Sequence, residues 1–351
     1  MGNNKKQRAI VICPGRGTYN RTELGYLQRY HSEHADTLAL FDAQRAAEGK
    51  PTLASLDTAT VFKSKEHLHA QNAAPLIYSC AYFDFLSIDR ERYDIVAVTG
   101  NSMGWYIALA CAGALSAIRG FELVSGMAEL TQGANLGGQL IYPLVDSAWQ
   151  VSNSHAAAVE AAIQDAAAHN DPLYWSIAFG GYAVLAGSHA AIKRALAALP
   201  PVEERYPFEL PGHSAFHTPL MQQASERGLE QFSTSFFKAP ELPLIDGNGR
   251  IWHATGTQAD ALRNYTLTTQ VTETYHLSKA VRVGLREFAP DVVLLTGPGS
   301  TMGGAVAQVM IEENWHGLQN KADFIAQQAS EPSLLALGIP EQRAQAISCV
   351  P

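Results

Sequence analysis

The chain has 351 residues, of which 47% are hydrophobic and 17% charged, a composition typical of folded globular proteins rather than of disordered ones. Its formal net charge of -8 argues against a general nucleic-acid binder, which needs a basic face to neutralise phosphates. No apolar run approaches the roughly 20 residues needed to cross a bilayer, and the N-terminal segment lacks the length and cleavage site of a signal peptide. We therefore expect a cytoplasmic protein that binds neither nucleic acid nor membrane.

Three segments combine an apolar run with a glycine-rich turn: 9–17, 93–104 and 291–304. Continuous apolar runs of this length are typical of strands buried on both faces, as in a parallel sheet covered by helices. The surrounding patterns predict helices over 72–87, 105–115, 118–130 and 302–312. Because such sheets place their chemistry in loops at the carboxyl ends of the strands, we expect the three turns to meet at one site.

Residues 138–209 have a different pattern, with the order strand, helix, strand, strand, helix, strand. This is the split βαββαβ order of a ferredoxin-like unit. The fold class predicted is therefore α/β, with a large α/β-hydrolase-like domain formed by 1–137 and 210–351 around a parallel-sheet core. An inserted ferredoxin-like subdomain would occupy 138–209. Beyond a helix over 219–232 and a strand over 243–247, the tail 317–351 predicts one or two peripheral helices.

Ser102 lies between two glycines in the sequence GNSMG, residues 100–104. In a nucleophile elbow a serine occupies a tight strand-to-helix turn, and flanking glycines avoid clashes there. The strand before and the helix after are both predicted here. The alternative is that Ser102 only caps the helix N-terminus.

A serine nucleophile needs a base, most often histidine. His213 and His217 lie in the loop HSAFHTPLM, and their spacing does not choose between them. Backbone N–H groups of Arg16, in the turn PGRG, and of Met103, directly after the serine, are candidate oxyanion donors. No histidine or cysteine spacing predicts a metal site. Neither the PGRG turn nor the later GPGSTMGG turn has the pattern of a nucleotide site.

Several motifs together resemble the malonyl-CoA:acyl carrier protein transacylases and the acyltransferase domains of fatty acid and polyketide synthases. CPGRG resembles the family's PGQG turn, GNSMGW its GHSxGE elbow and SAFHTPLM its histidine loop. LTTQVTETYHLSKAV resembles its glutamine-containing segment and LLTGPG its late GPG turn. The likeness spans about residues 9 to 315, in the same order.

The resemblance implies a role for each matching position. Ser102 would be the acyl-accepting nucleophile and His217 the base, since His217 occupies the family's place before the x-P-L-M element. Arg16 and Met103 would donate the oxyanion-hole N–H groups. Gln270 matches the position whose backbone carbonyl orients the histidine.

The acyl specificity departs from that of malonyl-handling relatives. The resemblance places Met127 where those relatives carry the arginine that binds the substrate's free carboxylate, and a thioether cannot offset the desolvation of a carboxylate. Arg119, two helical turns earlier, is more simply a surface cation. In synthase domains a phenylalanine such as Phe216 accompanies unbranched acyl units. These positions favour a short or linear uncharged acyl group rather than malonyl.

Three further departures are assigned to the substrate pocket: Asn101 and Trp105 replace the usual histidine and glutamate of the elbow, and Ala178 stands where relatives often have asparagine. We expect Trp105 to fill or cap the pocket.

The function expected is acyl transfer from an acyl-CoA or acyl carrier protein thioester to a phosphopantetheine thiol in fatty acid or polyketide biosynthesis, with no metal or other cofactor. Lys193 and Arg194 are candidates for docking an acidic carrier protein. Alternatives are an editing hydrolase of acyl carrier proteins and an inactive relative that binds carriers. A third is an α/β-hydrolase esterase with the triad Ser102, Asp291 and His316.

Overall fold

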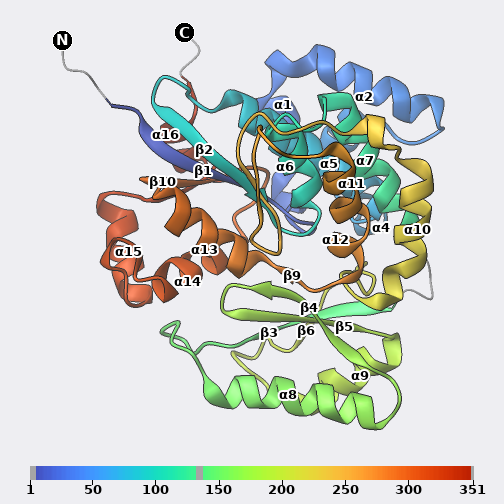
Figure 1. Cartoon of the computed structure of the whole chain (residues 1–351), viewed down its shortest axis with the longest axis vertical. Helices are drawn as coiled ribbons and strands as arrows, with labels where there is room; N and C mark the ends of the chain where they lie inside the picture. The colour runs from blue at the N-terminus through green and yellow to red at the C-terminus, as the bar shows by residue number, and fades with distance from the viewer. Residues whose placement is uncertain (1–4, 132–136, 349–351) are drawn as a thin grey trace.

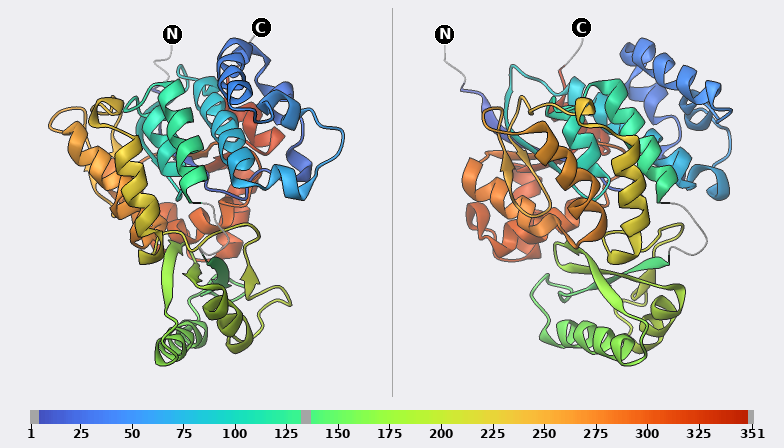
Figure 2. Two further views of the ribbon diagram at one scale, coloured as in Figure 1. Left: turned by 90° about the vertical axis from the view of Figure 1, so that its right-hand side faces the viewer. Right: turned by 45° about the vertical axis from the view of Figure 1, so that its right-hand side comes forward.

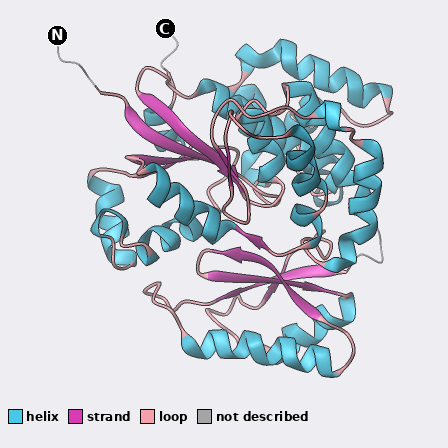
Figure 3. Ribbon diagram, in the orientation of Figure 1, coloured by secondary structure: helices cyan, strands magenta, loops and turns pink. Residues whose placement is uncertain are grey.

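The computed structural model describes residues 5–131 and 137–348; the predicted large domain also includes residues outside these ranges. The strands are β1 (Gln7–Cys13), β2 (Tyr93–Gly100), β3 (Gly138–Pro143), β4 (Leu173–Phe179), β5 (Tyr182–Gly187), β6 (Phe208–Glu209), β7 (Leu244–Ile245), β8 (Ile251–Trp252), β9 (Tyr275–His276), β10 (Val292–Leu295) and β11 (Leu334–Ala336). They form two sheets, which lie in the upper and lower parts of the molecule in Figures 1 and 3.

The α-helices are α1 (Tyr26–Tyr30), α2 (Ala35–Ala47), α3 (Leu53–Asp57), α4 (Ser64–His67), α5 (Ala70–Ser87), α6 (Gly104–Cys111), α7 (Ala117–Leu130), α8 (Asn153–Ala168), α9 (His189–Ala198), α10 (Gln222–Gln231), α11 (Ala259–Leu267), α12 (Thr269–Thr272), α13 (Leu277–Phe288), α14 (Gly303–Glu312), α15 (Lys321–Ser330) and α16 (Pro340–Ala346). Within the described residues, none of these helices combines the length and the apolar character that a membrane span requires.

The larger sheet has the strand order β11-β10-β1-β2-β7-β8, and all neighbours are parallel except β7 and β8. Its central strand β1 is covered on both faces. Ile10 lies under Gly284 of α13, and Cys13 faces Cys111 of α6. Because alternate residues of a strand point to opposite faces, α13 and α6 cover opposite sides of the sheet, as Figure 1 shows. This is why the strand sequences are continuously apolar.

The smaller sheet has the order β6-β3-β5-β4-β9. Within 138–209 the elements follow in the order β3, α8, β4, β5, α9, β6, which confirms the predicted α/β fold with an inserted ferredoxin-like unit. Helices α8 and α9 cover the face turned away from the large sheet (Figures 1 and 2). The fifth strand, β9, comes from outside the insertion and pairs in parallel with β4.

The tail differs from the expectation of peripheral helices alone. Helices α15 and α16 are present, but β11 lies between them and forms an edge of the large sheet through parallel pairing with β10. Residues Leu334 to Ala336 are fully buried. Three residues are too few to show a strand period, which is why the sequence pattern did not reveal them.

A buried ionic network connects the tail to the core. Asp84 of α5, fully buried, accepts hydrogen bonds from His31 Nε2 at 2.9 Å, Tyr26 Oη at 2.9 Å and the Gly297 N–H at 2.6 Å. Arg343 of α16 also pairs with this carboxylate. Burial alone would raise the pKa of Asp84, but the hydrogen bond from His31 and the charge of Arg343 hold it below its ordinary value.

Candidate active site

Ser102 occupies a strained turn between β2 and α6. Its φ is 55°, a left-handed conformation that costs energy for a residue with a side chain. A Cβ on Gly100 would lie 2.1 Å from the Gly104 carbonyl oxygen, and one on Gly104 would lie 2.3 Å from the Cys13 carbonyl oxygen. The two glycines therefore let the turn close on itself and let α6 pack against the end of β1.

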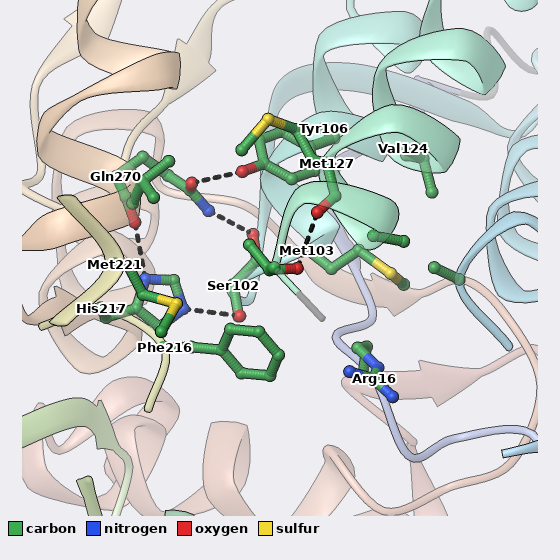
Figure 4. A pocket seen from close by; sticks show the side chains of 14 residues that line it. Arg16, Ser102, Met103, Tyr106, Val124, Met127, Phe216, His217, Met221 and Gln270 are labelled. Atoms are coloured by element: carbon green, nitrogen blue, oxygen red, sulfur yellow. Dashed lines mark hydrogen bonds between the residues drawn. The ribbon is translucent and has the colours of Figure 1, made fainter. Parts of the chain in front are cut away.

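The serine and one histidine are hydrogen bonded. Ser102 Oγ lies 2.6 Å from His217 Nε2, and His217 Nδ1 lies 2.6 Å from the Gln270 carbonyl oxygen (Figure 4). A carbonyl oxygen can only accept, so Nδ1 carries the ring proton. Nε2 is then the acceptor of the serine hydroxyl hydrogen, which is the arrangement that a general base requires.

The environment keeps this histidine neutral. Burial lowers the pKa of His217 to about 4, and the hydrogen bond to the Gln270 carbonyl only partly opposes this effect. His217 is 4% exposed, and Tyr275 lies against its ring. Nε2 is therefore free to accept a proton throughout the neutral pH range.

His213 has a different position from His217. Its Nδ1 lies 2.7 Å from Gln139 Oε1, on the small sheet. Gln139 also donates to Ser176 Oγ at 2.5 Å, and Ser176 donates to the Phe216 carbonyl at 2.7 Å. His213 thus belongs to a polar network that holds the histidine loop, a distinction that the sequence spacing could not make.

Gln270 lies on the short helix α12, and its side chain also contacts the elbow. Its Nε2 donates to the Ser102 carbonyl oxygen at 3.0 Å, and its Oε1 accepts from Tyr106 Oη at 2.7 Å. This position of Tyr106 was not predicted from the sequence. The signal was present, since Tyr106 follows Met103 by three positions and so lies on the same face of α6.

The two proposed oxyanion donors lie at the same pocket as Ser102. Neither the Arg16 N–H nor the Met103 N–H donates to an acceptor among residues 5–131 and 137–348. Met103 immediately precedes α6, where unpaired N–H groups and the helix dipole favour negative charge. The two turns are in contact, since a Cβ on Gly15 would lie 2.9 Å from Asn101 Nδ2.

A pocket of about 460 Å³ opens beside Ser102. Most of its walls are apolar, and Met127 and Phe216 are both part of them (Figure 4). Helix α7 contributes a stripe at helical spacing. The lining residues are Arg16, Ala74, Ser102, Met103, Tyr106, Val124, Met127, Ala128, Thr131, Phe216, His217, Met221, Gln270 and Val271.

Three residues that sequence analysis assigned to the pocket are not among those lining it. Trp105 is fully buried, and its Nε1 donates to Thr266 Oγ1 at 3.0 Å, so it neither fills nor caps the pocket. Asn101 is 8% exposed and supports the turn at Gly15. Ala178 lies on β4 and lines a separate pocket with Lys279.

The alternative esterase triad is not assembled. Asp291 precedes β10 and accepts from the Arg8 N–H at 2.7 Å, so it lies at the amino end of the parallel strands. Ser102 follows the carboxyl end of β2, at the opposite edge. His316 is exposed and stacked on Trp315.

The other basic residues considered from the sequence lie outside this pocket. Arg119 donates to the carbonyl oxygens of Ser235 and Phe236 at 2.6 and 3.2 Å. Lys193 is exposed on α9, and Arg194 Nε lies 4.0 Å from Asp165. Helix α9 is on the outer side of the small sheet (Figure 2).

One group of side chains has the composition of a metal site. Potential ligand atoms of His31, Glu33 and His34 lie within 4.8 Å of one another. His31 Nε2 is already bonded to Asp84, and none of the three lines the pocket at Ser102. Only His31 of the three belongs to the buried network around Asp84, since His34 is half-buried and Glu33 is exposed.

Comparison with known proteins gives the fold. No protein-family model matches the chain, and no curated protein does. A malonyl-CoA:acyl carrier protein transacylase from Xanthomonas oryzae pv. oryzae matches with a TM-score of 0.73 at 20% identity, over 98% of each chain. The chain has the fold of the malonyl-CoA:acyl carrier protein transacylases.

Two further solved structures agree. An acyl-carrier-protein S-malonyltransferase from Burkholderia pseudomallei has a TM-score of 0.72 and 18% identity, with 96% of this chain and 98% of that chain covered. A malonyl-transacylase solved in complex with a type II polyketide synthase acyl carrier protein has a TM-score of 0.71 and 18% identity, over 97% and 99% of the two chains. The shared fold therefore extends over almost the whole chain.

Proposed function

We propose that the chain is an acyltransferase that moves an acyl group from a thioester to a phosphopantetheine thiol through an ester on Ser102. The observation that carries the proposal is the 2.6 Å contact between Ser102 Oγ and His217 Nε2 at a strained elbow, with Nδ1 held by the Gln270 carbonyl. An activated serine in an apolar pocket is suited to nucleophilic acyl chemistry.

In the first half-reaction Ser102 Oγ attacks the thioester carbonyl carbon while its proton passes to His217 Nε2. The positive charge on the imidazolium is stabilised by the Nδ1–H bond to Gln270. The oxyanion accepts hydrogen bonds from the N–H groups of Arg16 and Met103. Collapse of the tetrahedral intermediate breaks the carbon–sulfur bond, and the departing thiolate takes the proton from His217.

In the second half-reaction an incoming thiol gives its proton to His217 Nε2, and its sulfur attacks the acyl-serine ester. The serine alkoxide leaves and recovers the proton from the imidazolium. These steps use groups of the chain and the thioester, without a metal or redox cofactor.

The proposed thiol is the phosphopantetheine arm of an acyl carrier protein. Support comes from the fold, since one solved relative is in complex with its carrier protein. Carrier proteins are typically acidic, and an enzyme with a net charge of -8 needs a local basic surface to attract one. Lys193 and Arg194 remain candidates for that surface.

The pocket wall formed by α7 affects which acyl groups the pocket favours. Val124, Met127, Ala128 and Thr131 line it and none is cationic, so nothing on that wall pairs with a substrate carboxylate. The expectation of a short, linear, uncharged acyl group depends on this wall and on Phe216. Recognition of a carboxylate would require a cation on another wall.

Transfer and hydrolysis are distinguished by the acceptor. The purified chain is incubated with acyl carrier protein carrying a radiolabelled acyl group, with and without coenzyme A. Label appearing on coenzyme A supports the transferase. Free acid released at the same rate in both incubations would show an editing hydrolase instead, and no acyl-enzyme with any thioester would show a protein that only binds carriers.

A further inference from the structure

The side chain of Arg16 extends into the pocket from the turn after β1. Figure 4 places its guanidinium across the pocket from Ser102, beyond the ring of Phe216. Its Nη2 lies 3.3 Å from the Leu68 carbonyl oxygen and 3.2 Å from that of Gly212. The guanidinium carbon is 5.6 Å from the centre of the Phe216 ring. The side chain is therefore held in one orientation by two carbonyls and an aromatic face.

This cation has no counter-charge. No acidic side chain of the described residues forms an ion pair with Arg16. Its Nε is buried without a hydrogen-bond partner. Burial lowers the pKa of Arg16 to about 10, so the guanidinium is still charged at neutral pH.

Other buried arginines of the chain show what a purely structural arginine looks like. Arg45 bonds through all three nitrogens, to the Pro51 carbonyl at 2.6 Å, the Gln71 carbonyl at 2.7 Å and Asn72 Oδ1 at 2.6 Å. Arg343 leaves Nε and Nη2 without partners, but it has the carboxylate of Asp84 as its counter-charge. At Arg16 only Nη2 is used, so this pocket-lining arginine has neither a counter-charge nor a full set of hydrogen bonds.

We infer that the Arg16 guanidinium binds a carboxylate carried by the acyl group itself, and so makes up for the missing cation on α7. This inference rests on the proposed function. The Arg16 backbone N–H is a proposed oxyanion donor, so its charge lies within one side-chain length of the reacting carbon. That distance suits a group on a short acyl chain and is too short for the phosphate at the far end of the pantetheine arm. A carboxylate would supply the counter-charge that the guanidinium lacks.

The inference changes the expected substrate class. Met127 on its own favours an uncharged acyl group. From the sequence, only the backbone N–H of Arg16 was assigned a role, so no cation was expected in the pocket. With its side chain in the pocket, the preferred substrates are acyl groups with a free carboxylate, bound from the PGRG turn instead of from α7. Arg16 is then the specificity-determining residue.

The test measures binding, so that it does not depend on acyl transfer. In a Ser102→Ala background, calorimetry gives the affinities for malonyl-CoA and acetyl-CoA, which differ by the carboxylate. We expect malonyl-CoA to bind about 10 to 100 times more tightly, because hydrogen bonds to a charged group supply that much discrimination. Adding Arg16→Gln should bring the two affinities within about threefold.

Matched variants separate recognition from structure. Arg119→Gln removes an arginine that bonds only carbonyls outside the pocket, and should leave the ratio of affinities unchanged. Arg16→Lys keeps the charge without the planar fork and should keep part of the preference. If Arg16 merely joined the loops at Leu68 and Gly212, Arg16→Gln would lower thermal stability or weaken both ligands equally and leave the ratio intact.

Equal affinity for the two thioesters in the Ser102→Ala protein, including no measurable binding of either, would overturn the inference. Failure of the proposed function has a different signature. In that case the otherwise unchanged chain would form no acyl-serine with either thioester, whatever the affinities of the Ser102→Ala variant.

Discussion

Gln270 holds both partners of the dyad in place through three different atoms. Its backbone carbonyl accepts from His217 Nδ1, its Nε2 donates to the Ser102 carbonyl, and its Oε1 accepts from Tyr106. One residue thereby holds the proposed base, the proposed nucleophile and α6. Preorganisation of this kind is what lets a catalytic pair act without rearrangement.

The pH dependence of acylation should report the buried base. Because burial lowers the pKa of His217 to about 4, the ring is neutral and able to accept a proton at every higher pH. We expect kcat/KM for acyl-serine formation to stay nearly constant between about pH 5 and 8. A loss of activity centred on about pH 6.5, the value of an unperturbed histidine, would contradict the burial argument. Circular dichroism at each pH controls for unfolding.

At the residue scale, the sequence motifs predicted which residues lie together, but not the direction in which individual side chains point. Ser102 and His217 were selected by motif, and the structure brings them together. Trp105 was expected in the pocket, but it lies about 200° round the helix from Met103, toward Thr266. The guanidinium of Arg16 was not considered, because a turn motif specifies a backbone and not the direction of a side chain.

At the elbow, the absence of a side chain on Gly104 lets α6 pack closely against the end of β1. With Gly104 the first residue of α6 lies against the last residue of β1, where a Cβ would come within 2.3 Å of the Cys13 carbonyl oxygen. The backbone fixes the position of a Cβ, and the atom it would meet is a backbone oxygen, so no side-chain rotation can relieve the clash. The helix start and the strand end therefore keep the two turns that carry the proposed oxyanion donors next to each other.

Gly104→Ala should separate α6 from β1. We expect it to lower the free energy of unfolding by at least about 2 kcal/mol and to slow acyl-serine formation about 100-fold, through displacement of the elbow. Gly303→Ala is the matched control, since it also lies at the start of a helix but its Cβ would lie 3.9 Å from the nearest side chain, Leu334. That variant should change stability by less than about 1 kcal/mol. If Gly104→Ala and Gly303→Ala had the same effect on urea unfolding and on the acylation rate, the close approach of α6 to β1 would not be what requires glycine at position 104.

The elements were predictable where they are long. The apolar run at 9–17 contains most of β1, the runs at 93–104 and 291–304 contain β2 and β10, and the pattern within 138–209 predicted the order of the inserted unit. β9 and β11 have two and three residues, and each is a strand only because a partner in another segment supplies its hydrogen bonds. Pairing of this kind is tertiary and leaves no local period.

On the scale of the whole molecule, the site depends on segments far apart in the sequence. Ser102 follows β2, His217 lies in the loop after the inserted unit, and Gln270 comes from α12. The histidine loop is held from the small sheet through Gln139 and Ser176. The inserted unit therefore helps to position His217, the proposed base.

The network around Asp84 should make a large contribution to global stability. Asp84→Asn would leave Arg343 buried without a counter-charge, and we expect it to lower the free energy of unfolding by about 3 to 5 kcal/mol in urea titration. Glu241→Gln, which breaks an exposed pair with Lys238, should cost less than about 1 kcal/mol. A loss at Asp84 no larger than at Glu241 would mean that the buried network does not hold the tail to the core.

The central claim is that Ser102, with His217 as its base, carries the acyl group as an ester. Intact-mass measurement after mixing with malonyl- and acetyl-thioesters tests it most directly. The account predicts that the chain gains the mass of one acyl group on Ser102, that Ser102→Ala gains none, and that His217→Gln gains it about 100 to 10,000 times more slowly. An adduct that forms equally well in the Ser102→Ala variant, or at an unchanged rate in His217→Gln, would contradict it.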